Sequence, residues 1–339
     1  MKSRSKVLVP VTFLLAASLA VAGCSSGPTE ASFDGKAPAK PPKSAPGGAS
    51  ATPAAPDNVQ MPTNVRKWNL QRELSDGTQV MWTTLKGPKS GFEGRVWAWV
   101  PKQYKEKKYQ NSAFPVLTAL PGASGYPTNY WFGSDFKLQE RIAQQIEEGK
   151  SLPFIVMMPV LNAKLDQYWD GSDIPNQPKM GTWMSDDVPD LARENFRTYK
   201  DPKGWGFFGS SAGGYVGMKM VLQYPDRFST AVAGGPDTAP DSPFWKGFEE
   251  QRLANDPARL ADALAKRNGP KVHLSFLLGD KEEGAKVKAF KEKIGKGPIE
   301  TDLHIIPNAG HDGYKYADGL FQGPLEWISK RMIGPVPAP

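Results

Sequence analysis

The stretch Trp205-Gly206-Phe207-Phe208-Gly209-Ser210-Ser211-Ala212-Gly213-Gly214 decides the fold of this chain. Gly209 to Gly213 form a G-x-S-x-G pattern with Ser211 at its centre. The apolar run before the pattern predicts a buried strand, and apolar residues at helical spacing follow it as far as Tyr224-Pro225. Between a strand and a helix, this pattern predicts a serine on a strained turn, with its hydroxyl pointing out of the sheet.

A second glycine pattern overlaps the first. Residues 204–209 spell G-x-G-x-x-G, which resembles a dinucleotide-binding fingerprint. That fingerprint needs its first glycine at the end of a strand and a helix directly after it. Here the first two glycines open the strand and bulky aromatic residues fill the gap, so we expect no nicotinamide or flavin cofactor.

The order of apolar segments predicts an α/β fold with a mostly parallel sheet. Continuous apolar runs alternate with helical patterns, as in strands that helices cover on both faces. Two earlier segments read as antiparallel N-terminal strands. The expected strands cover residues 80–85, 95–100, 114–120, 152–160, 205–208, 230–233, 272–278 and 303–306.

The N-terminus predicts export and lipidation. Three basic residues precede an apolar run that ends Val21-Ala22-Gly23-Cys24, so residues 1–23 are typical of a lipoprotein signal peptide. Cys24 is the single cysteine of the chain and is the candidate lipidation site. The alternative is ordinary secretory cleavage beside an incidental cysteine.

Composition divides the rest of the chain. Residues 24–62, rich in Pro, Ala, Ser and Gly, predict a lipidated cysteine followed by a disordered tether. Residues 63–335 are expected to form one domain, with a short tail at 336–339. The predicted location is the extracellular face of the bacterial cytoplasmic membrane, or the medium.

Charge and metal-ligand patterns exclude several classes of partner. The formal net charge is +7, and it falls to +4 when Lys2, Arg4 and Lys6 leave with the signal peptide. This is too mild to indicate nucleic-acid binding. No histidine or cysteine cluster has metal-ligand spacing. We expect a monomer without metal or cofactor.

A serine nucleophile needs a base, and the chain has three histidines. His273 and His304 lie within expected strands. His311 lies in a polar, glycine-rich loop after the last strand and downstream of Ser211, the order required in this kind of sheet. We therefore predict His311 as the base.

The acid is expected directly after the strand at 272–278. This strand ends in Gly279-Asp280-Lys281-Glu282-Glu283, which offers three carboxylates. Glu282 is preferred because it lies three residues after the glycine, and Asp280 and Glu283 stay open as alternatives. The acid would fix the imidazole tautomer and stabilise the imidazolium.

Two backbone amides are expected to stabilise the oxyanion. Ala212 directly follows the nucleophile at a helix N-terminus, and Ala123 lies in the turn after the strand at 114–120. The aromatic residues just beyond that turn are candidates for a substrate pocket: Tyr126, Tyr130 and Trp131.

Together, Leu120-Pro121-Gly122-Ala123, the Ser211 turn, Gly279-Asp280-Lys281-Glu282 and Gly310-His311-Asp312 carry a family likeness. The chain resembles the putative-esterase family of α/β-hydrolases, which includes esterase D, feruloyl esterase domains and the secreted mycolyltransferases of mycobacteria. The resemblance covers about residues 95–330. It departs from the mycolyltransferases at Pro121, where they carry an aspartate.

The resemblance implies an α/β-hydrolase fold and a serine esterase that acts on small-molecule or glycan esters. Two alternatives stay open. One is an acyltransferase on envelope glycans, as in the mycolyltransferases. The other is a non-catalytic envelope binding protein of the same fold.

Overall fold

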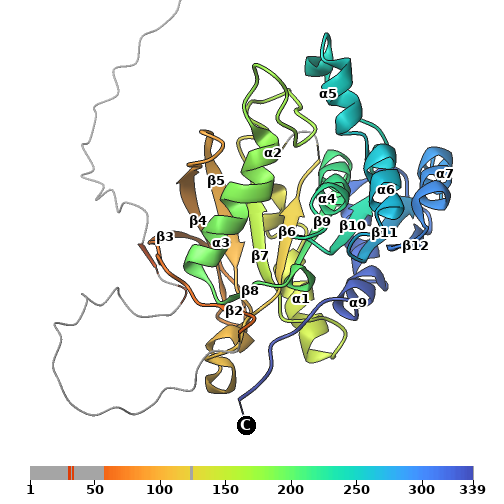
Figure 1. Ribbon diagram of the computed structural model, residues 1–339. Coiled ribbons are helices and arrows are strands. Elements are labelled where there is room, and N and C mark those ends of the chain that lie inside the picture. Colours follow the sequence, from red (N-terminus) through yellow and green to blue (C-terminus); the bar gives the residue numbers. More distant parts are fainter. Residues whose placement is uncertain (1–29, 32, 34–56, 123–124, 339) are drawn as a thin grey trace, which may run out of the picture.

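The computed structural model describes residues 30, 31, 33, 57–122 and 125–338. Within these residues the main sheet has ten strands in the order β1-β3-β4-β5-β7-β6-β9-β10-β11-β12. Pairing is antiparallel from β1 to β7 and parallel from β7 to β12 (Figure 1). This is the α/β-hydrolase architecture with antiparallel N-terminal strands that the sequence predicts.

The strands of the main sheet, in chain order, are β1 (Glu30–Ala31), β3 (Trp68–Glu73), β4 (Gln79–Lys86), β5 (Glu93–Trp99), β6 (Val116–Leu120), β7 (Ile155–Pro159), β9 (Trp205–Ser210), β10 (Thr230–Gly234), β11 (Val272–Gly279) and β12 (Ile299–Ile306). A second, two-stranded sheet pairs β2 (Val59–Gln60) with β8 (Thr198–Tyr199). The helices are α1 (Leu138–Glu147), α2 (Met180–Thr182), α3 (Val188–Asn195), α4 (Ala212–Gln223), α5 (Glu249–Ala254), α6 (Pro257–Lys266), α7 (Ala285–Ile294), α8 (Gly313–Leu320) and α9 (Pro324–Ser329).

Helices bury the central strands from both sides. Helix α4 packs on β6, β9 and β10, while α8 and α9 pack on β10 and β11. Every residue of β6, β7, β9, β10 and β11 is buried. This explains their continuous apolar sequences, because a strand covered on both faces has no solvent-facing side to alternate with.

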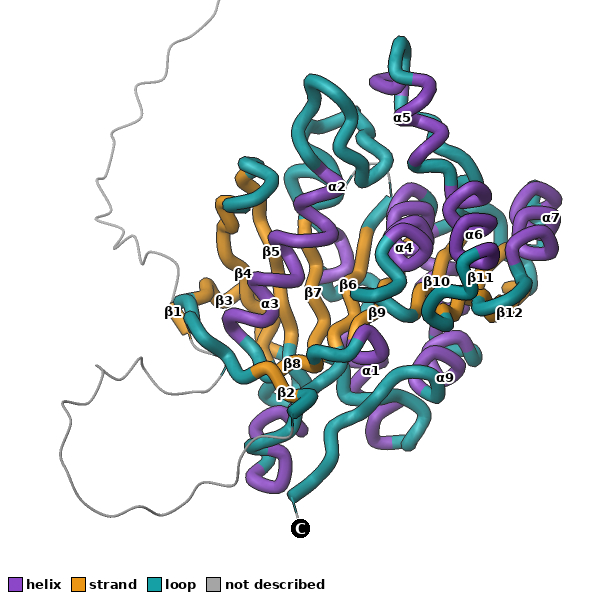
Figure 2. The backbone as a smooth tube through the Cα atoms, in the orientation of Figure 1, coloured by secondary structure: helices purple, strands orange, loops and turns teal. Residues whose placement is uncertain are grey.

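The register of the parallel strands brings their carboxyl ends together. Leu120 at the end of β6 lies opposite Gly209, and Ser210 at the end of β9 lies opposite Gly234. The turns that follow these three strands therefore begin side by side. The long loops after β7 and β10 rise from the same end of the sheet, beside α2 and α5 (Figure 2).

The expected tether is ordered at several described positions. Strand β1 pairs with β3, and Phe33 is 7% exposed, with its ring edge-on to Trp68 and Phe196. Val59 in β2 is also buried. The prediction of one disordered stretch from 24 to 62 is therefore wrong at these positions. Composition alone misses them, because isolated apolar residues can complete a core that other segments build.

Two glycines permit the close approach at the Ser211 turn. A Cβ placed on Gly209 would lie 2.3 Å from the carbonyl group of Gly213. A Cβ placed on Gly213 would lie 2.3 Å from the Pro121 carbonyl oxygen, in the turn after β6. Real Cβ atoms do not come this close to backbone, so helix α4 touches its neighbours here without any side chain between them.

Replacement of Gly213 by alanine should therefore push α4 away from the turn after β6. We expect Gly213→Ala to lower the free energy of unfolding by about 1–3 kcal/mol, measured by urea denaturation. The control is Gly313→Ala at the start of α8, where a Cβ would make only ordinary contacts of 3.8 Å. Equal stabilities for the two variants would contradict this account.

Candidate active site

The candidate nucleophile, Ser211, lies on a strained turn between β9 and α4. Its φ is 51° and its ψ is −123°, a conformation that residues with a side chain rarely adopt. Its N–H donates to the Gly234 carbonyl at 2.6 Å, which ties the turn to strand β10. Ser211 is partly exposed, and within the described chain its hydroxyl has no hydrogen-bond partner. The hydroxyl is thus presented at the end of the sheet.

The candidate base and acid are in direct contact. His311 follows β12, Glu282 follows β11, and Nδ1 of the imidazole lies 3.2 Å from Oε2 of the carboxylate. The hydroxyl of Tyr316 in α8 donates to the same Oε2 at 2.6 Å and lies 2.9 Å from Nδ1. The Gly279 N–H donates to the other oxygen, Oε1. The carboxylate is therefore held from several directions while it orients the imidazole.

Burial and hydrogen bonding set the charge states of this pair. The Glu282 side chain is 8% exposed, whereas that of His311 is 54% exposed. Burial alone would raise the pKa of Glu282, but the hydrogen bonds from His311 and Tyr316 hold that pKa below its ordinary value. The hydrogen bond to Glu282 raises the pKa of His311 above 6.5, against a smaller opposing effect of burial. An ionised carboxylate thus supports an imidazole that can become an imidazolium.

The other two candidate acids have different surroundings. Asp280 accepts the Ala309 N–H at 3.2 Å and so braces the loop that carries His311. Glu283 is exposed and lines an open cleft. Of the three carboxylates, Glu282 is the one in hydrogen-bond contact with the imidazole.

Ser211 and His311 both lie against the end of β10. Ser211 is bonded to Gly234, and a Cβ placed on the next residue, Gly235, would lie 2.8 Å from His311 Nδ1. No hydrogen bond joins the Ser211 and His311 side chains in the described part of the chain. The two groups share one end of the sheet, and the imidazole lies at its open surface.

The turn after β6 lies beside the nucleophile. A Cβ placed on Gly122 would be 3.7 Å from Ser211 Cβ. Ala212 begins α4, so its N–H lies at a helix N-terminus. Ala123, the other expected oxyanion donor, falls outside the described residues. The positions on either side of the expected oxyanion site are therefore the Gly122 turn and the start of α4.

Tyr130 joins this turn to the nucleophile strand. Its hydroxyl accepts the Gly122 N–H at 2.8 Å and is hydrogen-bonded to Ser210 Oγ. Burial raises the pKa of Tyr130, so the phenol stays protonated. The hydroxyl of this expected pocket residue is occupied in fixing the turn beside Ser211.

The other expected pocket aromatics are also packed. Trp131 is fully buried, and its indole N–H donates to the Leu120 carbonyl at 2.8 Å. Tyr126 is partly buried against the core. The rings of Phe136 and Tyr314 stack with their centroids 4.3 Å apart. No sequence motif singles out either residue, so this contact could be seen only in the folded structure.

An open cleft of about 490 Å³ adjoins His311. One wall is the loop after β10, with Asp237 and Asp241, and the other is the segment from Glu282 to Val287 at the start of α7. The two aspartates were also missed, because their loop matches no motif. Their proximity to the imidazole arises only from the strand order of the sheet.

Two fully buried ionisable residues, Asp170 and Lys219, brace the loops beside this cleft. Asp170 is fully buried in the loop after β7, and its Oδ2 accepts the Ser242 N–H at 3.1 Å and the Trp245 indole N–H at 2.5 Å. Lys219 of α4, also fully buried, donates to the carbonyls of Asp170 and Gly171 at 2.8 and 2.7 Å. Burial lowers the pKa of Lys219 to about 8, which leaves it mostly charged at neutral pH. The loops after β7 and β10 are thereby fastened to α4.

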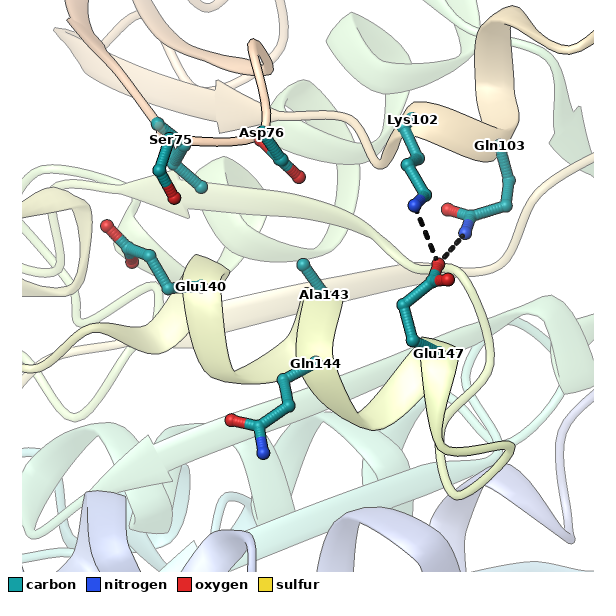
Figure 3. Close-up of a pocket in the computed structure, with 9 residues that line it drawn as sticks. Ser75, Asp76, Lys102, Gln103, Glu140, Ala143, Gln144 and Glu147 are labelled. Carbon is teal, nitrogen blue, oxygen red and sulfur yellow. Dashed lines mark hydrogen bonds and ion pairs between the residues drawn. The ribbon is translucent and has the colours of Figure 1, made fainter.

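A separate cavity of about 210 Å³ lies between the β3–β4 turn, residues 102–103 and α1 (Figure 3). None of the candidate catalytic residues lines it. Lys102 Nζ and Gln103 Nε2 both donate to Glu147 there, at 3.1 and 3.0 Å. Across the described residues, no group of three His, Cys, Asp or Glu side chains is placed to hold a metal ion. Nor does any helix there have the length and apolar character to span a membrane.

Comparison with known proteins places this geometry in a family. The family model described as "Putative esterase" matches residues 93–312, which include the Ser211 turn, Glu282 and His311. The chain belongs to this esterase family. Membership places it among the carboxylic-ester hydrolases.

Individual relatives are distant. An uncharacterized protein of Corynebacterium glutamicum, Cgl0967/cg1104, is 27% identical over 142 residues, which are 42% of this chain and 32% of the relative. The chain thus spans about a third of the length of this curated relative.

Solved structures share the fold. A ferulic acid esterase matches with a TM-score of 0.62 at 16% identity, over 75% of this chain and 98% of the other. An S-formylglutathione hydrolase from Agrobacterium tumefaciens matches with a TM-score of 0.60 at 19% identity, over 80% and 100%. A fluorophosphonate-binding serine hydrolase of Staphylococcus aureus, FphF, matches with a TM-score of 0.57 at 15% identity, over 74% and 98%.

If Glu282 supports His311, its removal should affect both rate and pH dependence. The imidazole must be neutral to act as a base, so kcat/KM for an ester should rise with pH through a midpoint above 6.5. In Glu282→Gln the imidazolium loses its carboxylate, so we expect this midpoint to fall and kcat to drop by roughly 10²- to 10⁴-fold.

The matched control for this experiment is Asp280→Asn, which alters a neighbouring carboxylate that does not touch His311. Its kcat should stay within about threefold of the wild type. If Asp280→Asn instead showed the larger loss of kcat and the lower midpoint of the pH–rate profile, the acid would be Asp280.

Proposed function

We propose that this chain is a serine esterase that works through an acyl-enzyme. Ser211 Oγ attacks the ester carbonyl while His311 Nε2 accepts the hydroxyl proton. The tetrahedral intermediate collapses, the bond to the alcohol oxygen breaks, and His311 returns the proton to the leaving alcohol. Water then attacks the acyl-enzyme, again giving a proton to His311, which passes it to Ser211 as the acid is released.

One observation carries this proposal: a histidine–carboxylate pair lies beside a serine held at positive φ. Glu282 is buried and bonded to Nδ1 of His311, which leaves Nε2 for the reacting groups. Ser211 has the strained backbone that exposes a nucleophile at the end of a sheet. A catalytic hydrogen bond between Ser211 and His311 would form as substrate binds, which is common for such pairs.

Stabilisation of the oxyanion is assigned to backbone amides. The Ala212 N–H directly follows the nucleophile, and the dipole of α4 adds positive potential there. Ala123 is the proposed second donor. Its support is the position of Gly122 against Ser211 and the hydrogen bond from Gly122 to Tyr130, which holds the start of that turn.

The proposed location is the extracellular face of the membrane, with the chain anchored by lipid at Cys24. Cys24 lies outside the described residues, and its support is the signal-like sequence before it. We expect metabolic labelling with a fatty-acid probe to mark the wild-type protein and not Cys24→Ala. An equally labelled variant would remove the anchor from the proposal.

Ser211→Ala should lower hydrolysis of p-nitrophenyl acetate by about 10³-fold or more and abolish labelling by a fluorophosphonate probe. Ser75→Ala is the matched control, because it removes an exposed hydroxyl in the β3–β4 turn, away from the candidate catalytic residues, and we expect it to keep the labelling. Equal hydrolysis by wild type and Ser211→Ala would overturn the proposal.

The same assay separates hydrolysis from acyl transfer to an envelope glycan. The open, exposed position of His311 favours water as acceptor. Acyl-sugar that forms faster than free acid when a disaccharide is added would instead support the acyltransferase alternative.

A further inference from the structure

Tyr316 is buried where the candidate base and acid meet. It belongs to α8 and is 1% exposed, and its hydroxyl lies 2.6 Å from Glu282 Oε2 and 2.9 Å from His311 Nδ1. Because Nδ1 lies 3.2 Å from the same Oε2, the three polar atoms form a closed triangle. The phenol oxygen is therefore nearer to the imidazole nitrogen than the carboxylate is.

The number of protons in this triangle fixes the direction of its hydrogen bonds. Although burial acts to raise it, hydrogen bonding keeps the pKa of Glu282 below its ordinary value, so the carboxylate is ionised and can only accept. A phenol carries one proton, and the shortest contact places it between Tyr316 and Oε2. The Tyr316 oxygen then has only lone pairs to offer Nδ1, so the proton in that contact must come from the imidazole.

A proton on Nδ1 satisfies both oxygens at once. The opposite neutral tautomer, protonated on Nε2, would turn the lone pair of Nδ1 toward Oε2 and the phenol oxygen. Tyr316 could then donate to Nδ1 only by giving up its bond to the carboxylate. The tautomer with the Nδ1 proton leaves Nε2 unprotonated, which is the state that a base for Ser211 needs.

The end of β10 makes room for the tyrosine. A Cβ placed on Gly235 would overlap the Tyr316 hydroxyl, and one placed on Gly234 would lie 2.7 Å from the Tyr316 ring. The same ring meets the His311 imidazole edge-on, with their centroids 5.5 Å apart. Gly234 also accepts the Ser211 N–H. The strand end that holds the nucleophile thus packs against the tyrosine that holds the base.

We propose that Tyr316 is a positioning residue of the esterase, whose hydroxyl fixes the proton of neutral His311 on Nδ1 and shares Glu282 Oε2 with the imidazole. This inference rests on the proposed function and adds a third member to the histidine–carboxylate pair. Tyr316 is not among the residues that line the cleft beside His311, so it acts through the imidazole. Burial, and then the hydrogen bond to Glu282, raise the pKa of Tyr316 well above its ordinary value, so the phenol keeps its proton throughout.

Other charged groups surround the pair and are unchanged by a substitution at Tyr316. The hydrogen bond to Glu282 is the largest cause that raises the pKa of His311, and the charge of Asp237, in the loop after β10, acts in the same direction. Asp312, at the start of α8, acts on the phenol. Further ionisable side chains near the imidazole are Asp280, which accepts the Ala309 N–H, and the cleft residues Asp241, Glu283 and Lys286.

Tyr316→Phe keeps the ring and removes one oxygen. We expect kcat for p-nitrophenyl acetate to fall about 10- to 100-fold with KM within about twofold, because the imidazole loses its fixed orientation while the contacts to substrate stay. With Oε2 left to the imidazole alone, the carboxylate should stabilise the imidazolium more strongly. The midpoint of the pH profile of kcat/KM should therefore rise by about 0.5 unit, opposite in direction to the change in Glu282→Gln.

Tyr109→Phe is the matched control. Tyr109 packs edge-on against Phe114, just before β6 and at the opposite end of that strand from the site. Its hydroxyl has no hydrogen-bond partner among the described residues, so kcat and the midpoint should equal those of the wild type. The inference is overturned if folded Tyr316→Phe keeps kcat within about twofold of the wild type. It is also overturned if kcat falls while the midpoint stays unmoved, because that outcome shows a structural role only.

Nitrogen NMR of the resting protein decides the inference even if Tyr316→Phe does not fold. Above the midpoint pH, neutral His311, assigned by comparison with His311→Gln, should carry its proton on Nδ1, and a proton on Nε2 would overturn the inference. In folded Tyr316→Phe the same signals should report a higher pKa for His311, and an unchanged pKa would contradict the proposal. These measurements need no turnover, so their outcome is separate from that of the proposed function, which equal hydrolysis by wild type and Ser211→Ala would overturn.

Discussion

The close approach of three backbone segments at the end of the sheet is the constraint on which the site depends. Helix α4 starts so near the turn after β6 that Gly213 has no room for a Cβ atom. Gly209 has no room for one either, because the Gly213 carbonyl group lies too close to it. The chain can enter the helix from β9 only through the positive φ of Ser211. That single backbone conformation presents the hydroxyl, aligns the Ala212 N–H and brings Gly122 against the nucleophile. Glycine positions, backbone strain and catalytic geometry are thus consequences of one packing requirement.

Around this point the structure uses paired or bonded polar groups rather than apolar contacts alone. Glu282 is nearly buried, but hydrogen bonds from a histidine, a tyrosine and a backbone amide keep it ionised. Asp170 and Lys219 are both fully buried, and each is bonded to backbone of a neighbouring loop or element. An unpaired buried charge lowers the stability of the fold by roughly several kcal/mol. These hydrogen bonds therefore satisfy the charged groups, and they also fix the positions of the loops. Hydrogen bonds to Asp170 and the stacked rings of Trp169 and Phe244 join the loops that follow β7 and β10, while apolar packing holds the strands beneath them.

The fold could be predicted from the sequence because the patterns that indicate it are local. Runs of apolar residues in the central strands, and the glycines around Ser211, record burial and close contact residue by residue. The candidate base and acid could be chosen for the same reason, since each directly follows an expected strand. Asp237, Asp241, Phe136 and Tyr316 could not, because their closeness to the site comes from strand order and helix packing. Trp131 shows the converse: an aromatic beside an expected oxyanion turn looks available for a ligand, yet its indole is fully buried and bonded to Leu120. The burial of Phe33 could not be predicted, because the residues around it have the composition of a disordered tether.

The pairing of β1 with β3 sets how much chain could lie between a lipid at Cys24 and the edge of the sheet. A tether that ran freely to residue 62 would allow the domain to range widely, whereas the pairing fixes the chain already at Glu30. Six peptide steps separate Cys24 from Glu30 and span at most about 20 Å when fully extended. If lipid is attached at Cys24, as proposed above, the edge of the sheet would lie within about this distance of the bilayer surface.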